Sequence, residues 1–181
     1  MDHSLFKLSK RGYTTIELII GMVVLLAFGI ITLIIVNPHQ LVLEGRDAQR
    51  KKEVIVLGEA LISFAKSKNG VIPQSTGLWL SDLEGRGEIK SLPEIIPYDA
   101  SAAICKVNQQ SQYCYTTDGR RPSNSAIVYT KLESTKENNK CNASLGETAY
   151  AVYDMLSVRG GVVCTIGVEP VFSTEGQRFL D

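Results

Sequence analysis

The feature that most constrains this chain is a run of 19 residues, Leu18 to Val36, without a charged side chain. As a helix this run is roughly 28 Å long, close to the ~30 Å hydrocarbon core of a bilayer. A core helix of that length usually carries a polar stripe, whereas here only Thr32 is polar. We therefore expect a transmembrane helix over residues 13–36, with the carboxylate of Glu17 in its first turn.

The flanks of the apolar run bear on its processing and orientation. The run is longer than the apolar region of a secretory signal, and no small-x-small cleavage site follows it, so we expect the helix to be retained. Positive charges lie on both sides, and their count does not decide the orientation: Lys7, Lys10 and Arg11 before the run, and Arg46, Arg50, Lys51 and Lys52 after it.

All four cysteines lie in the C-terminal part of the chain, which suggests two disulfides formed in an oxidising compartment. We favour Cys105–Cys114 and Cys141–Cys164, each contributing roughly 2–4 kcal/mol, but four cysteines allow three connectivities and the sequence does not choose among them. Reduced, buried cysteines are the alternative. Disulfides would place the C-terminal domain outside the membrane and the short N-terminus inside.

A second helical pattern follows the apolar run. Proline disfavours helix at the residue before it, so we expect one long helix with a kink or brief break at Pro38. Residues 37–70 continue it as an amphipathic helix, which Asn69-Gly70 ends. The apolar stripe recurs at three- and four-residue intervals and predicts packing on a globular domain: Val54, Leu57, Gly58, Leu61, Phe64 and Ala65.

Residues 71–181 are expected to form that globular domain. They begin with a connecting loop, residues 71–104, which contains a short helix around Trp79. A polar loop is expected at 133–146 and a turn at Gly160-Gly161. Alternating and β-branched residues predict four strands, at 112–116, 126–132, 148–153 and 162–166.

The predicted fold class is therefore α+β. It combines a long N-terminal helix, transmembrane in its first half and amphipathic in its second, with a small antiparallel β-sheet of three or four strands. The second half of the helix is expected to pack on the sheet.

The residues around Glu17 resemble a known signal. Lys10-Arg11-Gly12, then Tyr13-Thr14-Thr15-Ile16-Glu17-Leu18-Ile19 and a long apolar helix, resembles the type III signal (prepilin-type methylation motif) of type IV pilins and type II secretion pseudopilins. The resemblance covers roughly residues 7–36. It implies that residues 1–12 are a leader peptide, that prepilin peptidase cuts between Gly12 and Tyr13, and that it N-methylates Tyr13. Phenylalanine is more frequent than tyrosine at this new N-terminus.

The same resemblance makes Glu17 an assembly contact. An acidic side chain at the centre of a membrane helix costs about 2.5–3.5 kcal/mol, and less near an end, so it usually has a partner. The resemblance implies that Glu17 meets the free amine of Tyr13 on an adjacent subunit. The alternative is that the carboxylate reaches the lipid interface.

Composition narrows the remaining function classes. The chain has two histidines, His3 and His39, and a formal net charge of zero, which offers little for a histidine-based triad or metal site and no basic footprint for nucleic acid. We expect no enzyme activity and no cofactor. Some secretion pseudopilins bind calcium, and Asp118 and Glu137 offer oxygens, but the calcium-loop pattern is absent.

The resemblance thus implies a structural subunit, a pilin or pseudopilin, of a type IV pilus or type II secretion filament. Its partners would be prepilin peptidase, the membrane, and other copies of the chain or related pilins. It would start as a single-pass protein of the inner (cytoplasmic) membrane and end in a filament at the cell surface or in the periplasm. The alternative is a non-polymerising, membrane-anchored protein with an extracytoplasmic ligand-binding domain.

Overall fold

The structure is a computed structural model that describes residues 12–74, 76–99, 104–105, 108–120, 123–167 and 169–180. The predicted leader, residues 1–12, lies outside these ranges except for Gly12. The chain divides into two compact units, residues 1–41 and 42–181. Its fold is α+β, with an apolar N-terminal helix and a four-stranded antiparallel sheet, as the sequence predicts.

Two helices, α1 (Thr15–Val36) and α2 (Pro38–Ser67), occupy the stretch for which the sequence predicts one long helix. Asn37 separates them in a left-handed backbone conformation, with φ 44°. Pro38 disfavours helix at the residue before it, yet it suits the first position of a new helix, where its missing N–H is not needed. The prediction of one helix is therefore wrong, and the break expected at Pro38 is confirmed.

The sheet is a meander whose strands are neighbours in chain order. Each of the four predicted strands is present, with bounds that differ from the prediction by at most three residues: β1 (Cys114–Thr117), β2 (Ala126–Lys131), β3 (Glu147–Asp154) and β4 (Arg159–Ile166). Three short helices lie in the connections: α3 (Trp79–Gly85), α4 (Thr135–Asn138) and the 3-10 helix η1 (Ala143–Leu145). The sequence predicts the first of these but assigns the other two to a loop.

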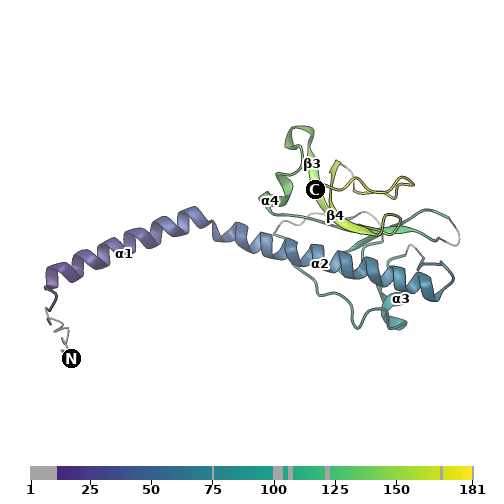
Figure 1. Cartoon of the computed structure of the whole chain (residues 1–181), viewed down its shortest axis with the longest axis horizontal. Coiled ribbons are helices and arrows are strands. Elements are labelled where there is room, and N and C mark those ends of the chain that lie inside the picture. Colours follow the sequence, from purple (N-terminus) through teal and green to yellow (C-terminus); the bar gives the residue numbers. More distant parts are fainter. Residues whose placement is uncertain are drawn as a thin grey trace, which may run out of the picture. The chain divides into compact units, whose positions relative to one another are not determined.

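Both faces of the sheet are covered. The apolar stripe of α2 packs on one face against Tyr115, Val128 and Ala151, and Figure 1 shows α2 lying along the sheet. Ile127 and Val152 belong to a second core on the opposite face, with Phe172 and Phe179 packed against it. Because successive strand residues point to opposite faces, β2 supplies both cores, which explains why nearly all of it is buried.

The prediction of a turn at Gly160-Gly161 is wrong, because both glycines lie inside β4. They pair with Tyr153 and Val152 of β3, and the turn falls at residues 155–158 instead. A Cβ on Gly160 would lie 2.7 Å from Cγ1 of Ile55, and one on Gly161 would lie 2.7 Å from the ring of Phe179. These glycines are needed for close packing on the two faces of the strand, not for chain reversal.

The closest approach between α2 and the sheet occurs at Gly58. A Cβ at this position would lie 2.0 Å from Cδ1 of Tyr153, whose ring is also limited by Gly160 on β4. Only a residue without a side chain leaves room for that ring. The distance between helix and sheet therefore depends on this glycine.

We expect Gly58→Ala to lower the free energy of unfolding by about 1–3 kcal/mol, because the added methyl group overpacks the ring of Tyr153. The matched control is Gly45→Ala on the same helix, where a Cβ meets nothing within 4 Å. This control should be neutral or stabilising by up to about 1 kcal/mol, since alanine favours helix over glycine. Thermal unfolding followed by Trp79 fluorescence measures both, and equal stability of the two variants would contradict this account.

Candidate functional site

The start of α1 brings together the residues expected at the processing and assembly site. Gly12 and Tyr13 lie in exposed, irregular chain just before the helix, and Tyr13 is 82% exposed. Thr14 is the N-cap, and its Oγ1 accepts the backbone N–H of Glu17 at 3.3 Å. Glu17 therefore lies in the first helical turn, where the helix dipole favours a negative charge.

The remainder of α1 is apolar on all sides. Its large apolar side chains between Ile16 and Ile31 are 46–72% exposed, and the chain itself buries none of the segment Thr15–Thr32. Among the described residues this is the one helix that is long and apolar enough to cross a membrane. Burying one such side chain contributes roughly 1.5–3 kcal/mol, so covering α1 with lipid or with other apolar helices would stabilise it.

A buried ionic group, which we call the clasp, joins Asp47 and Arg50 in the first half of α2 to Glu133, just before α4. Asp47 and Arg50 are each 1% exposed, and Nη1 of Arg50 lies 2.9 Å from the carboxylates of both Asp47 and Glu133. The Asp47 carboxylate also accepts the backbone N–H groups of Glu133 and Ser134, at 3.0 and 2.7 Å. These contacts attach α2 to the chain segment that precedes α4.

Arg50 also attaches α2 to a second segment. Its Nη2 donates to the carbonyls of Ile96 and Pro97, at 3.3 and 3.1 Å, and its guanidinium lies 3.7 Å from the centre of the Tyr98 ring. Tyr98 is held in turn by hydrogen bonds of 2.8 Å to Thr130 and to the carbonyl of Lys131, and burial raises its pKa to about 12. One buried cation therefore joins the helix, a loop and the end of β2.

Partly exposed ion pairs surround the clasp. Glu137 of α4 contacts Lys51 of α2 and Lys140, and Lys136 lies 3.3 Å from Glu44. Burial raises the pKa of Glu137, but the neighbouring ammonium groups outweigh it, and the net pKa is lowered. Glu137 therefore stays ionised at neutral pH and keeps α4 next to the helix.

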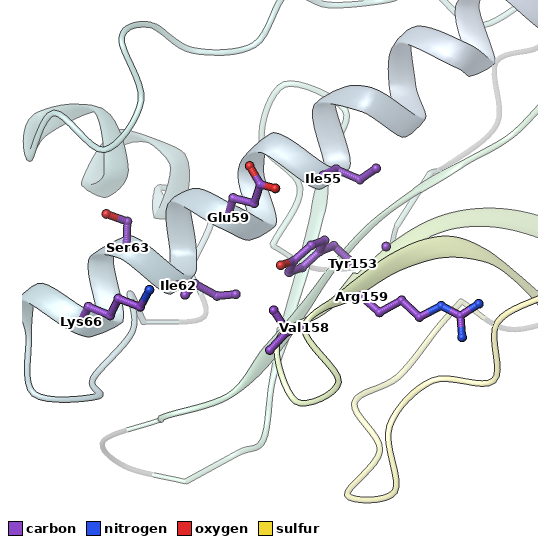
Figure 2. Close-up of a pocket in the computed structure, with 9 residues that line it drawn as sticks. Ile55, Glu59, Ile62, Ser63, Lys66, Tyr153, Val158 and Arg159 are labelled. Carbon is purple, nitrogen blue, oxygen red and sulfur yellow. The ribbon is translucent and has the colours of Figure 1, made fainter.

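An open pocket lies where the second half of α2 faces the β3–β4 turn. Its volume is about 550 Å³, and Figure 2 shows Tyr153 between the helix and the strands, with Arg159 pointing away. The guanidinium of Arg159 lies over the ring of Phe179 instead, 5.2 Å from its centre. The pocket is lined by Ile55, Glu59, Ile62, Ser63, Lys66, Tyr153, Val158, Arg159 and Gly160.

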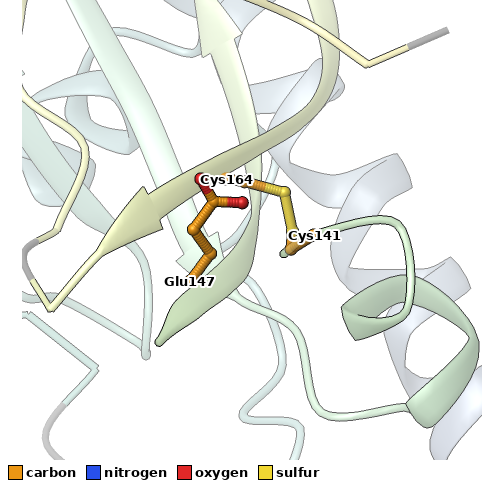
Figure 3. A group of neighbouring side chains, drawn as sticks. All are labelled: Cys141, Glu147 and Cys164. Carbon is orange, nitrogen blue, oxygen red and sulfur yellow. A yellow bond between two sulfur atoms is a disulfide. The ribbon is translucent and has the colours of Figure 1, made fainter. Parts of the chain in front are cut away.

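Two disulfides join the four cysteines in the pairs that the sequence analysis favours. Cys105 and Cys114 close a short loop at the entry to β1, and Cys141 and Cys164 join the segment after α4 to β4. Figure 3 shows the carboxylate of Glu147 next to the second pair. Cys141, Glu147 and Cys164 lie close enough together to hold a metal ion. The two sulfurs, however, form a disulfide and are therefore not thiolate ligands.

The oxygens considered for calcium are already used by the protein. Oδ1 of Asp118 accepts the N–H of Arg120 at 3.2 Å within a turn. The Glu137 carboxylate contacts two ammonium groups, those of Lys51 and Lys140. Asp118 and Glu137 belong to different parts of the domain and do not form one ligand group with a third acid or cysteine among the described residues.

Comparison with known proteins leaves the chain without a match: no family model, curated protein or solved structure is similar to it.

Sequence reasoning missed three features of these sites. Thr14 is a helix cap, and the signal for it is the pattern Thr14-x-x-Glu17, a capping box. Ser134-x-x-Glu137 carries the same signal for α4, where the Ser134 hydroxyl accepts the N–H of Glu137 at 3.3 Å. The clasp has no comparable signal, since charged residues on an amphipathic helix are usually solvated.

We expect Arg50→Met to lower the free energy of unfolding by about 3–5 kcal/mol, because it leaves the buried Asp47 and the largely covered Glu133 without their cation. Combined with Asp47→Asn, its effect should be smaller than the sum of the two single changes. The control is Arg46→Met, which removes a partly exposed ion pair with Asp99 and should cost at most about 1 kcal/mol. Urea unfolding compares the variants, and equal losses for Arg50→Met and Arg46→Met would contradict a special role for the clasp.

Proposed function

We propose that this chain is a structural subunit, a pilin or pseudopilin, of a type IV pilus or type II secretion filament. Prepilin peptidase removes residues 1–12, and the mature subunit polymerises through α1. The observation that carries the proposal is an apolar helix exposed on all sides, with a carboxylate in its first turn, directly after Lys10-Arg11-Gly12.

The chemistry of α1 supports two successive environments. Before assembly, lipid covers the apolar side chains, and in a filament neighbouring α1 helices replace the lipid. Cleavage before Tyr13 creates an amine four residues before Glu17, a spacing at which groups on one helix, or on adjacent helices in staggered register, come close. In a dry helix bundle this charge pair is less screened than in water.

The two disulfides support the placement of the C-terminal domain. Disulfides persist in oxidising compartments, so residues 42–181 belong outside the cytoplasmic membrane and the leader belongs on the cytoplasmic side, where prepilin peptidase cuts. The subunit is then a single-pass inner-membrane protein before it enters a filament.

We expect cells that contain prepilin peptidase to yield a mature protein that begins at Tyr13 and carries one added methyl group. Intact-mass measurement of membrane-extracted protein checks this. Gly12→Arg should keep the full mass of residues 1–181, and its fold should be unaffected, since a Cβ on Gly12 meets nothing within 4 Å. An unprocessed wild-type chain in such cells, or a processed Gly12→Arg variant, would overturn the proposal.

We expect Glu17→Gln to be processed normally but to enter filaments at least about tenfold less, because the amine of Tyr13 then lacks its counter-ion. The measure is the ratio of sheared filament protein to membrane protein. Glu84→Gln, an exposed acid on α3, is the matched control and should assemble as wild type. Filament-free function that survives Glu17→Gln would instead favour the membrane-anchored, non-polymerising alternative.

A further inference from the structure

The pocket between α2 and the β3–β4 turn has features that neither the core nor the proposed assembly through α1 uses. Its volume of about 550 Å³ lies within the ~300–1,000 Å³ typical of small-molecule sites. We call it the hairpin pocket, with the lining residues given above. It belongs entirely to the unit formed by residues 42–181.

Two opposite charges on the helical side of the pocket are not used by the fold. Within the part of the chain that the structure describes, neither Glu59 nor Lys66 takes part in an ion pair or a hydrogen bond. This contrasts with the first half of α2, where Asp47, Arg50 and Lys51 are all paired. Glu59 and Lys66 are seven positions apart, roughly 10 Å along the helix, and lie on the same face.

The surface between these charges is apolar. Tyr153 forms its floor, and its ring is fixed between Gly58 on α2 and Gly160 on β4. Ile62 lines the helical side, and Figure 2 shows it between Glu59 and Lys66 along the helix. The pocket therefore offers a cation, an apolar side chain and an anion in order along the helix, above the ring of Tyr153.

Val158 forms the opposite rim of the pocket and has an unfavourable backbone conformation. It is 64% exposed, and its φ of 52° places a β-branched residue in the left-handed region, which glycine or asparagine normally occupies. Neither core packing nor chain reversal requires valine here. Strained backbone of this kind persists mainly at binding and functional sites.

We propose that the hairpin pocket binds a short free peptide of about three residues with an apolar central side chain. An extended peptide advances about 3.3 Å per residue, so the two ends of a tripeptide are roughly 10 Å apart, which matches the rise along α2 between Glu59 and Lys66. The amine of the peptide pairs with Glu59 and its carboxylate pairs with Lys66. The central side chain lies against Tyr153, Ile62 and Val158.

The test uses the full-length protein in lipid nanodiscs and the tripeptide alanyl-leucyl-alanine, measured by titration calorimetry. We expect a Kd of about 1 mM or tighter. Acetylating the peptide amine or amidating its carboxylate should each weaken binding about fivefold, the effect of one exposed ion pair. Absence of binding at about 10 mM peptide would overturn the proposal.

Protein variants assign each end of the peptide. Lys66→Gln should weaken binding of the free peptide about fivefold but leave binding of the amidated peptide unchanged. Glu59→Gln should likewise weaken binding of the free peptide about fivefold but leave binding of the acetylated peptide unchanged. Lys68→Gln and Glu84→Gln, exposed charges outside the pocket, are matched controls and should bind as wild type. Losses that do not depend on which end of the peptide is blocked would contradict the assigned contacts.

Val158→Gly separates binding from folding. It should raise the melting temperature, because glycine relieves the left-handed strain, and yet weaken peptide binding, because an apolar contact is removed. A purely structural role for Val158 predicts unchanged binding, which would remove it from the site. These measurements do not depend on processing or assembly, so the peptide site and the proposed filament function succeed or fail separately.

Discussion

The arrangement of the domain formed by residues 42–181 depends on the contacts of one buried group, the guanidinium of Arg50. It lies among two carboxylates, two backbone carbonyls and an aromatic ring, from three separate parts of the chain. A buried ion pair adds little net stability compared with apolar residues, but a single broken partner is costly. The clasp therefore specifies one orientation of α2 on the domain, whereas the apolar stripe supplies most of the stabilisation.

The second constraint is the division of the helical stretch at Asn37. The large apolar side chains of α1 between Ile16 and Ile31 are exposed, whereas the first half of α2 pairs its charges with the domain and its stripe is buried on the sheet. These two helices need different surroundings, and the left-handed Asn37 with Pro38 ends one hydrogen-bonded ladder before the next begins. Each helix thus begins independently, α1 with the Thr14 cap and α2 with a proline.

Sequence patterns predicted the elements better than their contacts. Strand positions follow from alternation and β-branching, which are local, so β2 was placed within one residue. The prediction at Gly160 and Gly161 is wrong because a glycine pair is also a frequent turn signal. These glycines are instead required by close packing against Ile55 and Phe179, which are distant in sequence. The clasp was missed for the same reason, since Asp47 and Arg50 resemble solvated helix residues until the loops that cover them are known.

The cap at Thr14 bears on the part of Glu17 that remains available for assembly. The Thr14 hydroxyl accepts the N–H of Glu17, and the Glu17 carboxylate makes no hydrogen bond or ion pair with the residues that the structure describes. In the proposed mature subunit Thr14 is the second residue and keeps this role. The carboxylate is then available to a neighbour's amine, and it loses only the modest dipole interaction of about 0.3–1 kcal/mol if it turns away from its own helix end. A capping threonine next to the proposed cleavage point thus stabilises the start of the helix without occupying the acid that the proposed assembly uses.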